Sequence, residues 1–166
     1  MSHPDDVKKH IHSLSSLEKL VQQWHREKKK IVFTNGCFDL VHPGHLDYLS
    51  KAADLGDVLI VGLNTDASVN RLKGSDRPIV DENGRAFLIA SLRFVDAVVL
   101  FDEPTPYKLI QLVQPDVLVK GKDYKAEDVV GYDIVTARGG TVQTLDLVAG
   151  YSTTILIQKL LRNETK

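Results

Sequence analysis

The sequence predicts an α/β fold of the doubly wound class, in which helices cover both faces of a five-stranded parallel sheet. The first observation is a set of five short apolar runs rich in β-branched residues, which are typical of strands buried on both faces. The second is that segments with apolar residues at helical spacing separate these runs. The third is size, since 166 residues with 43% hydrophobic residues suit one core. We expect a single domain, with an N-terminal helical extension over residues 1–29 and a core over residues 31–161.

The first predicted helix covers residues 17–27. The stretch from Ser15 to Glu18 resembles a capping box and indicates where this helix begins. Its apolar residues recur at helical spacing and are Leu17, Leu20, Val21 and Trp24. We interpret this face as packing against the core, with a dimer contact as the alternative. The lysines at positions 28–30 follow the helix, where cations are favoured, and we interpret them as solvated.

The remaining elements are expected to alternate along the chain. Strands are predicted at residues 31–34, 58–63, 97–100, 117–119 and 141–145. Helices are predicted at residues 44–55, 83–94, 105–113 and 152–161. Thr105 and Pro106 have the arrangement of an N-cap followed by a first-turn proline, which indicates the start of the third of these helices.

Composition excludes several classes of protein. Lys and Arg number 21 against 22 Asp and Glu, so the broad positive surface expected of a nucleic-acid-binding protein is missing. Cys37 is the one cysteine of the chain, which excludes an internal disulfide and a cysteine-rich zinc site. The N-terminus shows no signal-peptide pattern, and no apolar run approaches the roughly 18 residues of a membrane span. We expect a cytoplasmic protein that binds neither nucleic acid nor membrane.

Polar and glycine residues follow four of the predicted strands, at residues 34–45, 64–66, 120–124 and 150–154. Ligands of doubly wound proteins bind outside the carboxyl ends of the strands, where these loops meet. The chain contains neither Gly-x-Gly-x-x-Gly nor Gly-x-x-x-x-Gly-Lys-Ser/Thr. The sequence therefore predicts a phosphate-binding cleft of another kind at this edge of the sheet.

A pair of histidines spaced by Pro43 and Gly44 lies at a predicted junction between strand, loop and helix. Gly44 lets a ligand approach the backbone, and the first N–H groups of the helix face that ligand. The imidazoles of His42 and His45 can donate hydrogen bonds to phosphoryl oxygens. The alternatives are that one histidine caps the helix while the other packs, or that the two bind zinc, which requires further ligands.

The stretch from Gly36 to His45 resembles the signature of the HxGH nucleotidyltransferase superfamily, in its cytidylyltransferase-like branch. Further blocks in the same order are similar to the adenylyltransferases of ADP-heptose synthesis, and these are Asn64–Val69, Arg71–Gly74, Arg77–Pro78, Val117–Tyr124 and Ser152–Thr154. The resemblance implies a Rossmann-like fold and transfer of AMP from ATP to D-glycero-β-D-manno-heptose 1-phosphate. Mg2+ is the implied cofactor, and ADP-heptose and pyrophosphate are the implied products.

The resemblance also implies roles for individual residues. Those expected to be catalytic are His42, His45 and Lys73. Those expected to bind the nucleotide are Asn35, Gly36, Cys37, Phe38, Gly44, Lys120, Gly121, Asp123, Ser152, Thr153 and Thr154. Those expected to bind the sugar phosphate are Asp39, Asn64, Asp66, Arg71, Arg77 and Arg85. No residue is expected to be a dedicated metal ligand, and the individual roles of Asp39, Lys122 and Arg85 stay open.

Two departures from related enzymes affect the choice of substrate. Residues 147–150 read Leu-Val-Ala-Gly where glycerol-phosphate cytidylyltransferases carry an Arg-Thr pair, which argues against cytidylyl transfer to glycerol phosphate. Residues 82–85 also differ from the acidic-Gln-Arg pattern of related fused enzymes, so the sugar pocket can differ. The alternatives are a cytidylyltransferase acting on glycerol or ethanolamine phosphate, and a non-catalytic nucleotide-binding module.

The family includes proteins fused to a sugar kinase domain. Only about thirty residues precede the first predicted strand, which is too short for a kinase, so we expect a stand-alone transferase. A homodimer is common among similar enzymes and is a possible assembly of this chain.

Overall fold

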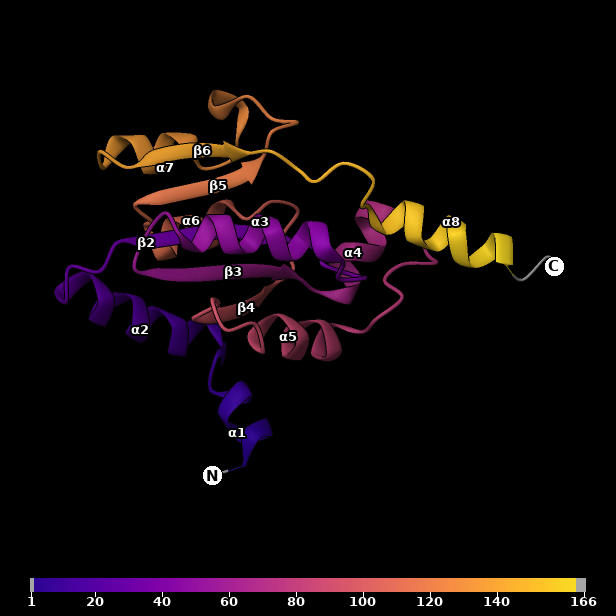
Figure 1. The fold of residues 1–166 in the computed structure, drawn as a ribbon. Coiled ribbons are helices and arrows are strands. Elements are labelled where there is room, and N and C mark those ends of the chain that lie inside the picture. Colours follow the sequence, from indigo (N-terminus) through magenta and orange to yellow (C-terminus); the bar gives the residue numbers. More distant parts are fainter. Residues whose placement is uncertain (1, 164–166) are drawn as a thin grey trace.

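The computed structural model describes residues 2–163 and contains one six-stranded sheet with helices on both faces (Figure 1). The strands are β1 (Ile11–His12), β2 (Ile31–Gly36), β3 (Val58–Asn64), β4 (Ala97–Phe101), β5 (Val117–Gly121) and β6 (Thr141–Leu145). Their order in the sheet is β1-β4-β3-β2-β5-β6, and every neighbouring pair is parallel. The predicted parallel α/β architecture is confirmed.

The predicted number of five strands was wrong because of β1. This strand has two residues and pairs with β4 at the edge of the sheet, with Ile11 opposite Val98 and His12 opposite Val99. A run of two residues is too short to produce a detectable alternation of apolar and polar residues. The five strands predicted from apolar runs all occur, most of them with one or two further residues.

The helices alternate with the strands and vary in length. They are α1 (His3–Lys8), α2 (Leu14–Arg26), α3 (Pro43–Ala53), α4 (Asp66–Lys73), α5 (Glu82–Ala90), α6 (Tyr107–Val113), α7 (Tyr132–Ala137) and α8 (Thr153–Asn163), with a short 3-10 helix, η1, at Ala126–Asp128. The sequence did not predict α1, α4, α7 or η1. These elements have three to eight residues, which is about two turns or fewer, so they show little periodicity.

The start of α2 differs from the prediction. The helix begins at Leu14, and Ser13 is its N-cap, with a side-chain oxygen that accepts a hydrogen bond from the backbone N–H of Ser16 at 3.2 Å. The predicted cap at Ser15 was wrong because several serines in succession offer the same capping chemistry. The apolar face of the helix packs in the core, where Leu17 and Val21 are buried.

The start of α6 was also predicted wrongly. Pro106 occupies the N-cap position, the helix begins at Tyr107, and no side chain caps it. Thr105 therefore lies one residue outside the position at which a hydroxyl would cap this helix.

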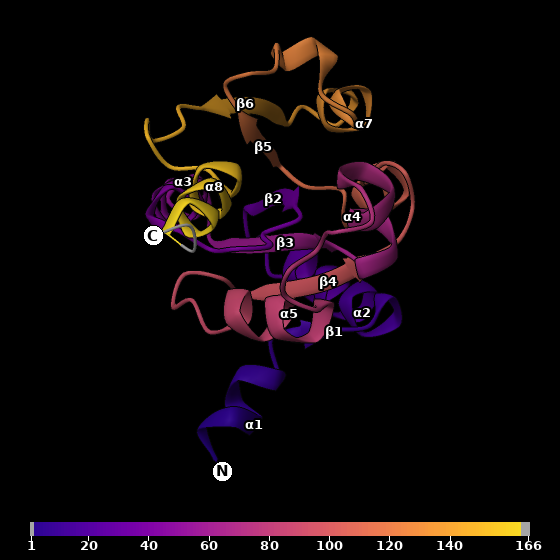
Figure 2. The same cartoon turned by 90° about the vertical axis from the view of Figure 1, so that its right-hand side faces the viewer.

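Two apolar clusters lie on opposite faces of the sheet. One cluster joins residues of α2, α6 and α7 to one face, and the other joins residues of α3 and α5 to the opposite face. Figure 2 shows α3 and α5 on one side of the sheet and α2 and α7 on the other. All seven residues of the central strand β3 are buried, as expected of a strand covered on both faces. Within residues 2–163, no helix has the length and apolar character needed to cross a membrane.

The order in which the chain adds strands to the sheet reverses between the neighbouring strands β2 and β5. From β2 the chain moves to β3 and β4 on one side and later returns to place β5 and β6 on the other side. The loops that follow β2 and β5 therefore diverge at their carboxyl ends, and this divergence leaves a crevice. The N-terminus of α3 lies at the same edge, and α8 begins there and then projects away from the sheet (Figure 1).

Candidate active site

A cavity of about 450 Å³ occupies the crevice at the carboxyl edge of the sheet. Its walls come from the loop between β2 and α3, the first turns of α3, the end of α4, the loop after β5 and the segment that leads into α8. The lining residues are Asn35, Gly36, Cys37, Phe38, Asp39, His42, Gly44, His45, Tyr48, Lys73, Arg77, Lys120, Gly121, Asp123, Tyr124, Leu147, Val148, Tyr151, Ser152, Thr153 and Thr154.

The cavity brings together residues from five sequence blocks. All three predicted catalytic residues and all predicted nucleotide-binding residues line it. Of the residues predicted to bind the sugar phosphate, Asp39 and Arg77 line the cavity, whereas the other four are absent from its walls: Asn64, Asp66, Arg71 and Arg85.

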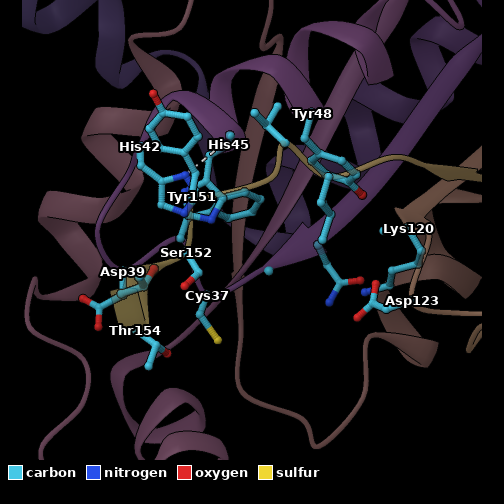
Figure 3. Close-up of a pocket in the computed structure, with 18 of the residues that line it drawn as sticks. Cys37, Asp39, His42, His45, Tyr48, Lys120, Asp123, Tyr151, Ser152 and Thr154 are labelled. Atoms are coloured by element: carbon cyan, nitrogen blue, oxygen red, sulfur yellow. Dashed lines mark hydrogen bonds between the residues drawn. The ribbon is translucent and has the colours of Figure 1, made fainter. Parts of the chain in front are cut away.

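The imidazoles of His42 and His45 are stacked in one wall of the cavity. Their ring centroids lie 3.7 Å apart with an interplanar angle of 18°. Phe38 packs edge-on against His45 at 5.2 Å, and the ring of Tyr151 lies 6.1 Å from that of His42. Figure 3 shows the rings of His42, His45 and Tyr151 gathered together in the cavity. Aromatic packing on both sides restricts the rotation of the two imidazoles.

Gly44 is required by this packing. A Cβ at this position would lie 3.1 Å from the ring of His42 and 3.1 Å from the Cβ of Tyr151. Both distances are tighter than ordinary van der Waals contact, so a side chain would displace the histidine or the segment before α8. The glycine of the histidine motif therefore serves close packing within the protein.

The hydrogen bonding of His42 indicates its tautomer. His42 is the N-cap of α3, and its Nδ1 accepts a hydrogen bond from the backbone N–H of His45 at 3.3 Å. When Nδ1 of a neutral imidazole accepts, Nε2 carries the proton and is a donor. The capping alternative and the phosphate-binding interpretation are therefore compatible, because one ring nitrogen caps the helix while the other stays available.

Burial keeps both histidines neutral near pH 7. Loss of hydration, together with a smaller effect of the neighbouring His42, lowers the pKa of His45 to about 4. Burial likewise lowers the pKa of His42. Neutral imidazoles act on an incoming anion as hydrogen-bond donors and carry no net charge of their own.

This shift predicts that acid destabilises the fold. A histidine with a pKa of about 4 in the folded state and about 6.5 in the unfolded state binds protons preferentially when unfolded. The free energy of unfolding should therefore fall as the pH drops from about 6.5 towards about 4. We expect His45→Phe to lose less stability than the wild type between about pH 7 and about pH 5 in chemical denaturation. Equal losses of stability in the two proteins would contradict the assignment of a lowered pKa to His45. His3→Ala, at an exposed position, is the control.

Two buried polar atoms of the cavity lack a hydrogen-bond partner within the described residues. They are the side-chain oxygen of Asn35 and Nδ1 of His45. Buried polar atoms without partners are rare in folded proteins and are explained by a ligand or an ordered water. Both residues line the cavity, although the two atoms themselves are buried.

A lysine and a carboxylate lie at the end of β5. Burial lowers the pKa of Lys120 to about 8, while the nearby carboxylate of Asp123 opposes this shift. Figure 3 shows Lys120 and Asp123 close to each other and apart from the stacked rings. A bound anion would raise the pKa of Lys120, because a phosphate stabilises the charged ammonium that burial disfavours.

Asp39 is buried and organises the segment that precedes α5. Burial by itself would raise the pKa of Asp39, but hydrogen bonds from the backbone N–H groups of Val80 and Ile79 and from Arg77 hold this pKa below its ordinary value. The ion pair between Arg77 Nε and Asp39 Oδ2 measures 2.5 Å. The carboxylate therefore anchors Arg77 beside the cavity.

Arg71 lies outside the cavity despite its prediction as a substrate-binding residue. Its guanidinium forms an ion pair with Asp102 at 3.0 Å and donates to the backbone oxygen of the same residue. The side chain of Asp102 also accepts from Thr65, the N-cap of α4. Lys73 lines the cavity whereas Arg71 does not, because residues two apart on a helix do not share a face.

Asn64, Asp66 and Arg85 form a network behind the wall. The amide of Asn64 donates to Ser68 Oγ at 3.0 Å, and Asp66 pairs with Arg85 at 2.7 Å. The Arg85 side chain is fully buried and does not line the cavity, although the sequence analysis expected it to bind the sugar phosphate.

Several lining residues were missed by the sequence analysis. Tyr48 lies on α3 one turn after His45, and its hydroxyl shares a 2.8 Å hydrogen bond with Thr34. Tyr124, Leu147, Val148 and Tyr151 complete the apolar part of the wall. The i, i+3 spacing of Tyr48 from His45 is the one signal that could have identified it.

The first turn of α8 borders the cavity. Ser152 caps this helix, with a side-chain oxygen that accepts from the backbone N–H of Ile155 at 3.1 Å. Thr153 and Thr154 follow in the first turn, where backbone N–H groups lack intrahelical partners. This arrangement suits an anion, because free N–H groups and the helix dipole act in the same direction.

Comparison with known proteins identifies relatives over most of the chain. The profile of a family described as cytidylyltransferase-like matches residues 33–159. The bifunctional protein HldE of Citrifermentans bemidjiense is 54% identical over 151 residues, which cover 91% of this chain and 31% of that protein. The chain thus spans about a third of the length of the curated relatives that it matches.

Solved structures agree with this result. The lipopolysaccharide core biosynthesis protein of Thermoplasma volcanium is 34% identical, with a TM-score of 0.59, over 72% of this chain and 97% of that chain. A pantoate-beta-alanine ligase of Francisella tularensis has a TM-score of 0.57 at 15% identity, over 82% of this chain and 66% of that chain. The second likeness concerns the fold alone.

Proposed function

Because the chain belongs to the cytidylyltransferase-like family and is a nucleotidyltransferase, we propose that it transfers AMP from ATP to D-glycero-β-D-manno-heptose 1-phosphate, releasing pyrophosphate. The observation that carries this proposal is the convergence of five sequence blocks on one cavity that combines neutral imidazole donors, cations and a helix N-terminus. The identity of 54% to a bifunctional protein HldE supports the choice of acceptor.

The acceptor phosphate is the nucleophile in this reaction. An oxygen of the sugar phosphate attacks the α-phosphorus of ATP, a new P–O bond forms, and the bond from that phosphorus to the pyrophosphate oxygen breaks. The second pKa of a phosphate is about 6, so the attacking oxygen is already an anion near neutral pH. No side chain has to remove a proton, which agrees with histidines that cap and stack.

The protein therefore acts by alignment and by stabilising charge. In this proposal, Nε2–H of His42 and the imidazole of His45 donate to oxygens on the α-phosphorus, whose charge rises in the transition state; the cap at Nδ1 of His42 and the stacking of the two rings support these roles. Preorganised donors in a partly dehydrated site need no rearrangement when that charge develops. Aromatic packing and the cap on α3 supply this preorganisation.

Cations from different segments of the chain bind the two substrates in this proposal. Lys73 at the end of α4 and Arg77, held by Asp39, both line the cavity and suit the acceptor phosphate. Lys120 on β5 and the first turn of α8 suit the triphosphate. Holding two anions together in this way offsets their mutual repulsion and places the reacting atoms in contact.

Mg2+ belongs to this proposal as the companion of the triphosphate. Within residues 2–163, no group of three or more His, Cys, Asp and Glu side chains is arranged to hold a metal ion. Mg2+ commonly binds through one or two carboxylates together with substrate phosphates and water. The carboxylate of Asp123 lines the cavity and fits that pattern, whereas the carboxylate of Asp39 is already bonded to Arg77 and to backbone N–H groups; the ion would neutralise phosphate charge.

The base of the nucleotide is expected to be adenine. Release of pyrophosphate should be at least about tenfold faster with ATP than with CTP, with heptose 1-phosphate as acceptor, if base contacts differ by about 1.4 kcal/mol. The measurement is kcat/KM for both nucleotides against heptose 1-phosphate, glycerol 3-phosphate and ethanolamine phosphate. Turnover of CTP as fast as that of ATP, or no turnover with the heptose phosphate, would refute the assignment.

A further inference from the structure

The largest fully buried side chain of the described residues is a charged one, Arg85 on α5. None of its side-chain surface is exposed, and it does not line the cavity. Burying a cation without partners is strongly unfavourable, so hydrogen bonds and an opposite charge must compensate for the burial of Arg85.

The guanidinium of Arg85 donates to four acceptors in three segments of the chain. Nη1 donates to the backbone oxygen of Cys37 at 2.7 Å and to that of Asn64 at 2.8 Å. Nε donates to the backbone oxygen of Val80 at 2.9 Å, and Nη2 donates to Asp66 Oδ1 at 2.7 Å. A planar fork of five donors can satisfy acceptors in four directions, which a lysine ammonium on a flexible chain cannot do.

These contacts fasten the loop that carries the histidine motif. Cys37 lies in this loop, between the end of β2 and the start of α3, and its side chain lines the cavity. The same loop is held at Asp39, which accepts from the backbone N–H of Val80 at 2.9 Å. The backbone of Val80 thus accepts a hydrogen bond from Arg85 through its carbonyl and donates one to Asp39 through its N–H. Arg85 and Asp39 therefore hold the loop together through the same residue.

We propose that Arg85 is a positioning residue, which sets the place of the loop between β2 and α3 and thereby aligns His42 and His45 with the reacting phosphorus. This inference rests on the proposed function for its catalytic part. The alignment part stands on the four contacts alone. A misplacement of about 1 Å can cost about 100-fold in rate, so the effect should be large although no substrate atom is touched.

Cys37 provides a readout of the loop that is independent of turnover. It is the one cysteine of the sequence, and its half-buried Sγ lies 3.8 Å from Asn64 Oδ1. Burial raises the pKa of this thiol, whereas the charges of Lys73 and Arg85 oppose the rise. Arg85→Lys keeps the positive charge near the thiol but removes the planar set of guanidinium donors. Faster alkylation of Cys37 in this variant therefore reports movement of the loop and not loss of a charge.

The experiment compares Arg85→Lys and Asp66→Ala with wild type and with a control variant, Arg93→Lys. Arg93 is exposed and lies in the segment that follows α5. Arg85→Lys should lower kcat by about 10- to 100-fold, with KM for ATP changed by less than about threefold. Alkylation of Cys37 by iodoacetamide should become at least about threefold faster, at temperatures well below the melting transition. Arg93→Lys should match the wild type in both measurements.

Asp66→Ala retains the arginine and removes one of its partners, so it keeps the test valid if Arg85→Lys fails to fold. We expect a smaller loss of kcat, about three- to tenfold, together with faster alkylation. Wild-type kcat and wild-type alkylation in the folded variants would overturn the proposal. A rise in KM at unchanged kcat would also overturn it, because that pattern belongs to ground-state binding.

Failure of the proposed function is distinguishable from failure of this inference. If wild type releases no pyrophosphate from ATP and heptose 1-phosphate, the proposed function is wrong. The alkylation rates then still decide the alignment part, because they require neither substrate nor turnover. Faster alkylation in Arg85→Lys would support the role in positioning the loop, and unchanged alkylation would overturn it.

Discussion

His45→Ala is expected to lower kcat by about 100- to 1,000-fold, because removal of one preorganised donor from such a site costs that much. The imidazole of His45 is neutral, since burial lowers its pKa to about 4, and it is held between His42 and Phe38. The loss should appear at every pH tested, because a donor of this kind does not depend on a proton transfer. Steady-state release of pyrophosphate at saturating ATP and heptose 1-phosphate measures it.

The variant His45→Asn separates donation from base catalysis. An amide can donate a hydrogen bond but cannot accept a proton from the acceptor phosphate and pass it on, so it should recover part of the lost activity. His3→Ala, on the exposed face of α1, is the control and should behave as wild type. If His45→Asn is as inactive as His45→Ala while added imidazole rescues the alanine variant through its free base, a histidine acts as a base and the mechanism is wrong.

Lys73→Ala is expected to lower kcat/KM by about 10- to 1,000-fold, because in the proposed reaction its ammonium binds substrate phosphate and stabilises charge in the transition state. Lys73 is the last residue of α4 and lines the cavity. Both kcat and KM should change, since the ammonium acts on the bound acceptor and on the transition state. Measurement of both constants, together with a thermal melt, separates this loss from a loss of folding.

Arg71→Ala is the matched control for that variant. Arg71 lies two residues before Lys73, is exposed, and pairs with Asp102 outside the cavity. Exposed ion pairs contribute about 0–1 kcal/mol to stability, so this variant should fold and retain activity within about twofold. Equal losses in the two variants would show that the end of α4 acts through its fold and that Lys73 has no specific role.

The strands were predictable because burial on both faces leaves continuous apolar runs, as in β3. The short elements α1, α4, α7 and β1 were not, because elements of two to eight residues carry little periodicity and are held by tertiary contacts. For α4 a local signal did exist, since Thr65 caps the helix and accepts from the backbone N–H of Ser68.

The sequence predicted which segments line the cavity better than it predicted which way each charged side chain turns. A motif preserves the order of residues along the chain, so the histidine loop, the end of β5 and the start of α8 could be assigned to one ligand. The same motif does not tell whether a charged side chain turns to the ligand or into the protein. Arg71 and Arg85 carry the positive charge that suits a phosphate, and Asp66 can accept hydrogen bonds from sugar hydroxyls, but all three are bonded to protein groups.

The amino-acid sequence alone determined the alternation of strands and helices, the edge of the sheet at which the cavity lies, and the histidine motif, because hydrophobic period and residue order are local properties of the chain. The tertiary structure decided which cations face the cavity, why the histidines are neutral, and that Arg85 is buried behind the loop. These properties depend on distances between segments far apart in sequence, as in the contact between Arg85 and Cys37. Burial and hydrogen bonding across such distances set both the pKa of a group and the direction in which it points.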